Sequence, residues 1–168
     1  AGSHEPGMTR ERLSEIRRAE QRAACAQVGV SDVVFLGYDD GFLQPTLELR
    51  RELVRVLRQY RPEVAITWDP TMLFGGDNYI NHPDHRAAAQ AALDAIAPAC
   101  AMPLVWPETG APHRVRKVYI ESHNQANTWI DISATLELKI AALKQHKSQM
   151  GDWDPTEMIT QWAAEAGK

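Results

Sequence analysis

The sequence is poor in cysteine, has no long apolar run and carries no strong excess of charge of one sign. Its two cysteines, Cys25 and Cys100, lie far apart in alanine-rich stretches. This usage predicts buried free thiols of a cytoplasmic protein, not a disulfide framework or a paired zinc motif. No apolar run approaches the roughly 18 residues of a membrane span, and no signal peptide is recognisable. We therefore expect a cytoplasmic protein with no membrane partner.

The net charge of −4 argues against a nucleic-acid partner, because phosphate binding needs a concentrated basic face. One predicted helix does carry a run of arginines, Arg50, Arg51, Arg55, Arg58 and Arg61. Glu48 and Glu52 lie among them. A solvated helix face is therefore the favoured interpretation of this run, and a binding patch is the alternative.

The chain has 168 residues, of which 44% are hydrophobic and 24% charged. This length and balance fit one globular domain over residues 1–168, with enough bulk to bury a core. The apolar spacing predicts helices and strands in alternation. The helices are expected at 10–28 (capped by Thr9), 45–60, 83–97 and 134–147 (capped by Ser133), with an amphipathic segment from 154. The strands are expected at 32–36, 63–67, 115–121 and 129–132. This order predicts an α/β fold with a mainly parallel sheet covered on both faces.

The stretch from Tyr79 to Arg86 concentrates the possible chemistry of the chain. Pro83 suits the first position of a helix, which places His82 near the N-cap and His85 in the first turn. Two imidazoles three residues apart project to the same side, and Asp84 between them is able to bind an imidazole Nδ1–H or to cap the helix. The pair is therefore interpreted either as half of a metal-hydrolase site or as a helix cap with a surface histidine. A hydrolytic zinc needs three protein ligands.

Other polar residues offer weaker signals. His4, His113, His123 and His146 lack ligand spacing and are interpreted as surface or core histidines. Asp39 and Asp40 follow the predicted strand at 32–36, where open α/β sheets bind ligands, but both also suit a turn before Gly41. Arg17 and Glu20 flank the apolar stripe of the first helix. They are interpreted as a surface ion pair or, for Arg17, as a cation held toward a pocket.

Several segments together resemble the PIG-L/LmbE family of zinc-dependent de-N-acetylases, which includes deacetylases of mycothiol and bacillithiol biosynthesis. The segments follow family order over nearly the whole chain. They are residues 15–20 (EIRRAE), 35–41 (FLGYDDG), 61–64 (RPEV), 81–88 (NHPDHRAA) and 139–149 (KIAALKQHKSQ). Only the His-Pro-Asp-His segment is specific by itself, and the ordered set makes the match strong.

The resemblance implies a Rossmann-like three-layer domain that removes an N-acetyl group from an N-acetylglucosamine-type sugar or conjugate through zinc-activated water. His85 resembles the family's third zinc ligand. His82 resembles the histidine that stabilises the tetrahedral intermediate, and Asp84 the carboxylate that orients it. Arg17 and Asp40 resemble residues of the substrate pocket. Tyr79 resembles a loop tyrosine near the reacting carbonyl, one residue off its usual spacing.

One family motif is absent. The family opens on a strand ending in an Ala-His-Pro-Asp-Asp-Glu type of sequence, which provides two zinc ligands and the general base, and residues 1–168 contain none. We expect these ligands and the N-terminal strand upstream of Ala1. A sheet without that strand leaves backbone hydrogen bonds open, so we expect residues 1–168 alone to fold poorly.

Two other functions remain open from the sequence. The first is a non-catalytic α/β binding domain derived from the family and lacking the first ligand motif. The second is a different metal hydrolase that takes its remaining ligands from a partner chain. The exact substrate is open, and an oligomer is possible.

Overall fold

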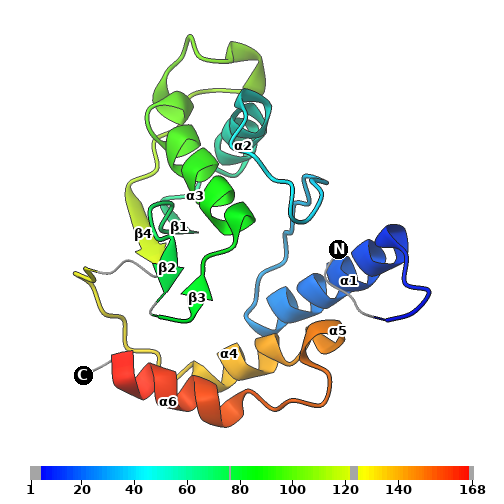
Figure 1. Cartoon of the computed structure of the whole chain (residues 1–168). Helices are drawn as coiled ribbons and strands as arrows, with labels where there is room; N and C mark the ends of the chain where they lie inside the picture. Colours follow the sequence, from blue (N-terminus) through cyan, green and yellow to red (C-terminus); the bar gives the residue numbers. More distant parts are fainter. Residues whose placement is uncertain (1–4, 76, 122–124, 167–168) are drawn as a thin grey trace. The chain divides into compact units, whose positions relative to one another are not determined.

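The computed structural model describes residues 5–75, 77–121 and 125–166 (Figure 1). The chain divides into two compact units. The histidine unit is Leu36–Ala126, and the helical unit combines Ala1–Phe35 with Asn127–Lys168. His4 and His123 lie outside the described residues. No helix of the described residues is both long and apolar enough to span a bilayer.

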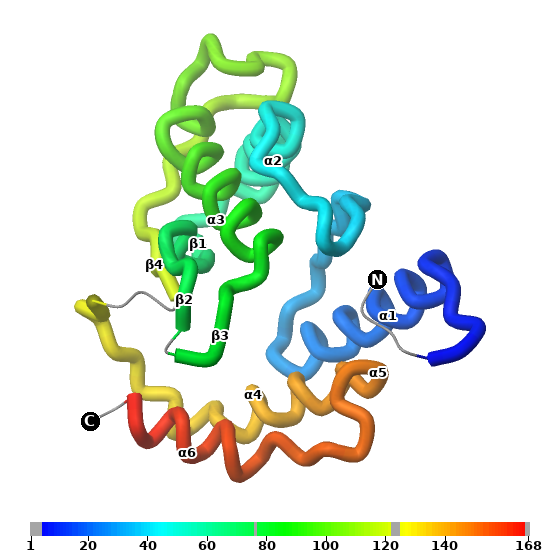
Figure 2. The backbone as a smooth tube through the Cα atoms, viewed as in Figure 1, coloured from blue at the N-terminus to red at the C-terminus, as the bar shows by residue number. Residues whose placement is uncertain are grey.

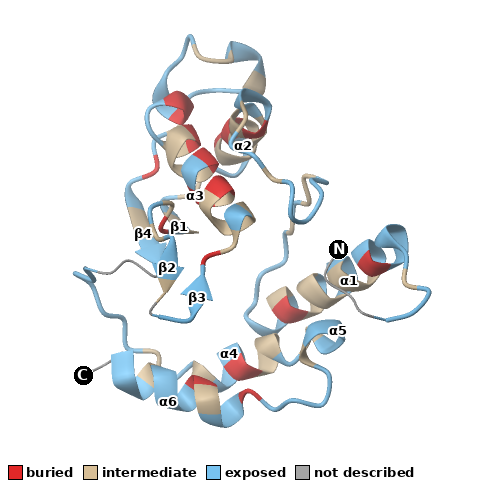
Figure 3. Cartoon of the chain, viewed as in Figure 1, coloured by how far each residue is buried: buried red, intermediate tan, exposed pale blue. Residues whose placement is uncertain are grey.

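Two helices form the core of the histidine unit. Helix α2 (Leu47–Tyr60) begins at Thr46, whose hydroxyl accepts a hydrogen bond from the Leu49 N–H at 3.2 Å, so the predicted start at residue 45 was early. Helix α3 (Pro83–Ile96) packs against α2, and its buried residues are all alanines (Figures 2 and 3). The core cluster is Val54, Ala95 and Ala99, with Leu53, Leu57, Val105 and Trp106 around it.

Strands β1 (Val64–Trp68) and β4 (Lys117–Glu121) confirm the predicted parallel sheet. They pair in register from Val64 opposite Lys117 to Trp68 opposite Glu121. Helix α3 contacts β1. Alternate β1 side chains are exposed: Val64 by 47%, Ile66 by 72% and Trp68 by 37%. One face of β1 is therefore apolar and open to solvent.

A short hairpin lies between β1 and α3. Strand β2 (Phe74–Gly75) pairs antiparallel with β3 (Tyr79–Ile80). Gly75 lies opposite Tyr79, and a Cβ atom at Gly75 would come within 2.8 Å of the Tyr79 ring. A larger residue at this position would therefore displace the tyrosine ring.

Arg58 was expected on a solvated helix face, and that expectation was wrong. Its side chain is 4% exposed and donates hydrogen bonds to the segment that contains the 3-10 helices η1 (Ala99–Ala101) and η2 (Pro107–Thr109). The acceptors are the carbonyls of Ala99, Cys100, Met102, Val105, Trp106 and Gly110 and the hydroxyl of Thr109. These oxygens satisfy the buried guanidinium and fix the segment on α2. Of the neighbouring arginines, Arg50 pairs with Asp94 and Arg55 with Glu52.

The helical unit contains four described helices. Helix α1 (Arg10–Gln27) begins as predicted at Thr9, whose hydroxyl accepts from the Arg12 N–H. It packs against α4 (Leu136–Leu143) and α5 (Lys147–Met150), and α4 packs against α6 (Thr156–Ala166). The Glu20 carboxylate accepts both the backbone N–H and the hydroxyl of Ser148, each at 2.7 Å. This pair of bonds ties α1 to the start of α5.

Three predicted elements of this unit were wrong. Residues 32–36 and 129–132 are described and form no strand. A single strand needs a neighbour to satisfy its backbone, and Phe35 instead lies beneath the guanidinium groups of Arg18 and Arg22. Trp129 and Ile130 are exposed. The helix expected at 134–147 is two helices, and Ser133 does not cap it, because the N-cap residue of α4 is Thr135. The N–H and hydroxyl of Ser133 donate instead to Asp131.

Both cysteines are free thiols, as expected. Cys100 is fully buried, and burial raises the pKa of its thiol. Cys25 is half-buried and accepts a hydrogen bond from Gln21. Cys100 is therefore a packing residue with low thiolate character.

Candidate functional site

His82 begins helix α3. It occupies the N-cap position before Pro83, and its ring Nδ1 accepts a hydrogen bond from the backbone N–H of Asp84 at 3.2 Å. The His82 carbonyl accepts from the N–H of His85. The histidine side chain thus replaces the serine or aspartate that usually caps a helix, and its ring is held at the positive end of the helix dipole.

This hydrogen bond fixes the tautomer of His82. A backbone N–H can only donate, so the lone pair of Nδ1 is occupied, and a neutral ring carries its proton on Nε2. The Nε2–H group is then a hydrogen-bond donor. A neutral His82 in this arrangement has no lone pair left for a metal ion.

Asp84 connects the start of α3 to the loop after residue 39. Its carboxylate accepts the N–H of Gly41 at 2.6 Å and the N–H of Leu43 at 3.2 Å. Gly41 has φ +87°, a left-handed conformation that favours glycine. Asp84 therefore contacts the His82 ring through its backbone N–H. Its carboxylate binds the loop residues Gly41 and Leu43 instead.

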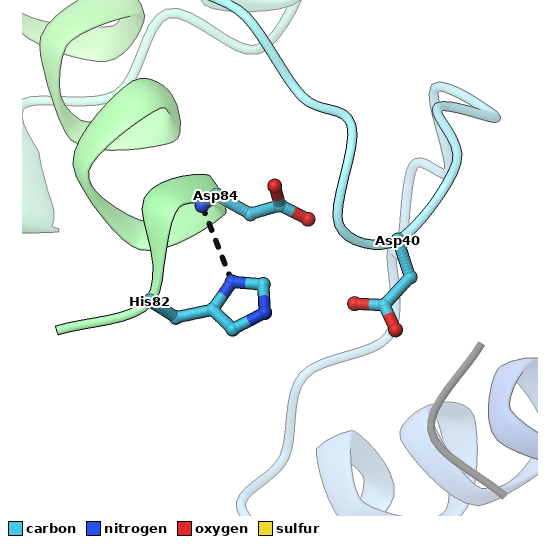
Figure 4. Close-up of side chains that lie close together, drawn as sticks. All are labelled: Asp40, His82 and Asp84. Atoms are coloured by element: carbon cyan, nitrogen blue, oxygen red, sulfur yellow. Dashed lines mark hydrogen bonds between the residues drawn. The ribbon is translucent and has the colours of Figure 1, made fainter. Parts of the chain in front are cut away.

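The loop places Asp40 beside His82. One ligand atom from each of Asp40, His82 and Asp84 lies within 4.8 Å of the others, close enough for the group to hold a metal ion (Figure 4). Imidazole and carboxylate are donors that suit zinc. However, Asp84 accepts two N–H groups and His82 accepts one. A metal ion bound by all three residues would have to displace or share these hydrogen bonds.

His85 lies one helical turn further on. Its ring stacks on Trp68, with centroids 4.8 Å apart and planes 17° apart, and lies 5.4 Å from the His82 ring. The Nδ1 atom of His85 is buried and has no hydrogen-bond partner among the described residues. A buried imidazole nitrogen with no partner is rare, and it marks His85 as a group that a ligand or a further hydrogen bond has yet to satisfy.

The structure brings together Asp40, His82, Asp84 and His85 of the predicted site. Arg17 lies on α1 in the helical unit, and Tyr79 is half exposed on β3. Asn81 was not among the predicted site residues. It is fully buried, and its side-chain Nδ2 donates to the Met72 carbonyl. A polar residue in a Gly/Asp/Asn-rich loop is ordinarily exposed, so its position before His82 was the only signal.

Three comparisons with known proteins agree on a class of relatives. A PIG-L family model, described as GlcNAc-PI de-N-acetylase, matches residues 1–96. A diacetylchitobiose deacetylase from Thermococcus kodakarensis is 30% identical over 149 residues, which are 83% of this chain and 54% of the relative. A 1D-myo-inositol 2-acetamido-2-deoxy-alpha-D-glucopyranoside deacetylase from Nocardioides is 33% identical over 134 residues, 65% of this chain and 42% of the relative. The chain thus spans about half the length of these curated relatives.

Two solved structures share the fold. The N,N'-diacetylchitobiose deacetylase from Pyrococcus horikoshii superposes with a TM-score of 0.83 at 24% identity, over 98% of this chain and 61% of that protein. A conserved protein from Thermus thermophilus, TT1542, superposes with a TM-score of 0.71 at 27% identity, over 91% of this chain and 68% of that protein. The α/β fold with a parallel sheet is therefore the fold of these structures.

Proposed function

Because the chain belongs to the PIG-L family of GlcNAc-PI de-N-acetylases, we propose that it takes part in metal-dependent hydrolysis of the N-acetyl group of an N-acetylglucosamine-type sugar or sugar conjugate. The observation that carries this proposal is the geometry of the side chains at the start of α3. There a capping histidine presents a fixed Nε2–H donor beside two carboxylates, within the segment that the family model matches.

His82 is the group proposed to stabilise the reacting amide. Attack of water on the acetyl carbonyl places negative charge on its oxygen. The Nε2–H of His82 and the N-terminal end of α3 both favour such a charge. One donor of this kind contributes about 2.7–4 kcal/mol to transition-state stabilisation.

His85 is the proposed metal ligand, and zinc is the proposed metal. A bound zinc ion supplies Lewis-acid activation of the carbonyl and of the attacking water. The occupied Nδ1 lone pair of His82 supports this division of roles, because it leaves His85 as the histidine of the pair whose ring has no hydrogen bond among the described residues that occupies a lone pair. His85 provides one of the three protein ligands that such a site needs.

The two carboxylates have different roles in this proposal. Asp84 holds the 41–43 loop against α3, and this keeps Asp40 next to His82. Asp40 is proposed to contact the substrate, and the same role for Arg17 rests on the resemblance to the family. We also propose a cytoplasmic protein whose partner is a small N-acetylated sugar and not nucleic acid or a membrane.

Acetate release from the whole protein tests this proposal. The substrates are N,N'-diacetylchitobiose and the glucosaminyl-inositol conjugate, and an acetyl-lysine peptide is the amide control. We expect acetate from a sugar substrate with zinc present, none after treatment with a chelator, and recovery when zinc is restored. Zinc-loaded protein that binds these sugars without releasing acetate would favour the non-catalytic binding domain.

A further inference from the structure

Three buried side-chain atoms at the start of α3 have no hydrogen-bond partner among the described residues. They are Oδ1 of Asn81, Nδ1 of His85 and Nε of Arg86. Asn81 is fully buried. Buried side-chain oxygens and nitrogens are nearly always satisfied in folded proteins. Of the three, Asn81 Oδ1 and His85 Nδ1 are an acceptor and an imidazole nitrogen four residues apart, and they point to a further interaction of this site.

Both residues face the same stretch of chain, residues 68–73. Trp68 stacks on the His85 ring. The Asn81 side-chain Nδ2 donates to the Met72 carbonyl at 2.9 Å, and its backbone N–H donates to the Leu73 carbonyl at 2.8 Å. A carbonyl can only accept, so the amide nitrogen must face Met72, and Oδ1 is the end of the amide that is left over.

The two atoms are chemically complementary. Oδ1 of Asn81 is an uncharged acceptor, and Nδ1 of a neutral imidazole donates when it carries the proton. A histidine with its proton on Nδ1 has its lone pair on Nε2, the form in which it binds a metal ion. Metal-binding histidines usually donate their other N–H to a carbonyl, a carboxylate or water, which fixes ring orientation and tautomer.

We propose that Asn81 is a positioning residue whose Oδ1 accepts the Nδ1–H of His85, directly or across one water molecule. Asn81 then holds His85 as an Nε2 ligand, while the backbone N–H of Asp84 holds His82 as an Nε2–H donor. Neighbouring histidines are thus kept in opposite tautomers by two different partners. This inference rests on the proposed function, in which His85 binds the metal.

Zinc affinity of the whole protein, measured by competition with a chromophoric chelator, separates this role from a purely structural one. Asn81→Ala removes the acceptor, and we expect about a 10- to 100-fold loss of zinc affinity. Asn81→Asp keeps an acceptor oxygen but removes the donor to Met72, and we expect near wild-type affinity. Gln90→Ala, which removes an exposed amide on the same helix, is the control. An unchanged affinity in Asn81→Ala, or equal losses in the two Asn81 variants, would overturn the inference.

A second measurement needs no variant of Asn81. In the zinc-loaded wild type, ¹⁵N spectra of the imidazole side chains should show the His85 proton on Nδ1, and a proton on Nε2 would overturn the inference. His85→Ala distinguishes a failure of this inference from a failure of the proposed function. If it loses zinc while Asn81→Ala binds zinc normally, the inference fails and the proposed function stands. If it retains zinc, the ligand assignment itself fails, and the inference fails with it.

Discussion

At the scale of single residues, the site depends on the two ways in which Asp84 makes hydrogen bonds. Its backbone N–H fixes the tautomer of His82, and its carboxylate holds the N–H groups of Gly41 and Leu43. The family resemblance predicts instead that the carboxylate orients the imidazole. These two roles affect different measurable quantities, so they can be separated.

Asp84→Asn tests which role the carboxylate has. The amide offers one acceptor oxygen to two backbone N–H groups, so loop holding predicts a loss of stability of about 1–3 kcal/mol and a higher KM. Differential scanning calorimetry and steady-state kinetics measure both quantities. Asp77→Asn, at an exposed carboxylate of the same unit, is the control. A variant with unchanged stability and KM but much reduced kcat would instead support direct orientation of the imidazole.

Residue chemistry that is local in sequence was predictable, and burial was not. Pro83 after His82 identified the helix start, and Thr9 identified another, because caps act within three residues of their own position. Arg58 and Asn81 carry polar side chains in sequence contexts typical of the surface. Their burial depends on carbonyl groups up to 52 residues away along the chain for Arg58 and nine for Asn81. Rules based on residue spacing along a helix or strand do not predict hydrogen-bond partners of this kind.

At the scale of elements, helices were easier to predict than strands. Helices α1, α2 and α3 were predicted from apolar spacing and helix-start residues, although α2 begins later than expected, and β1 and β4 were found within two residues of their bounds. The segments 32–36 and 129–132 have strand composition but no strand beside them. Strand formation depends on a partner, so composition alone did not decide these two segments.

The connection from α5 to α6 gives a prediction for the pH dependence of the helical unit. The hydroxyl of Thr156, its backbone N–H and the Lys144 ammonium group together lower the pKa of Asp154 from 3.8 to about 2. A lowered pKa in the folded state means that the charged carboxylate stabilises the fold above pH 3.8 and that this contribution is lost as the pH falls toward 2.

Carboxyl ¹³C shifts of Asp154, followed by NMR during an acid titration, should give a midpoint near 2. Asp154→Asn should remove its share of the acid dependence of unfolding, because an amide does not titrate. A wild-type midpoint near the ordinary value of 3.8 would show that the Thr156 and Lys144 interactions do not form in solution.

At the scale of the whole molecule, the sheet of the histidine unit has an apolar face in solvent. Parallel strands are ordinarily covered on both faces, yet Val64, Ile66 and Trp68 are exposed. The chain also spans about half the length of its curated relatives. The chain divides into two compact units. The expectation that residues 1–168 form one domain stays a prediction.

We expect residues 1–168, expressed without further sequence, to bind the dye ANS and to unfold without a sharp transition. The reason is that one face of β1 exposes apolar side chains, and among the described residues β1 pairs with β4 alone, which leaves its other edge unpaired. Fluorescence and thermal scans provide the measurement, and light scattering reports the oligomeric state. A cooperative, monomeric melt with no ANS binding would contradict this expectation.

The central claim is that the two histidines of α3 have different roles, and zinc content measured beside turnover tests it most directly. Whole protein carrying His82→Ala should keep zinc at the wild-type ratio and lose turnover by about 10²- to 10³-fold, the effect of removing one oxyanion donor. Protein carrying His85→Ala should lose both zinc and turnover. His146→Ala, at a histidine of the helical unit, should change neither. Equal zinc content in wild type and His85→Ala, or loss of zinc from His82→Ala, would contradict the account.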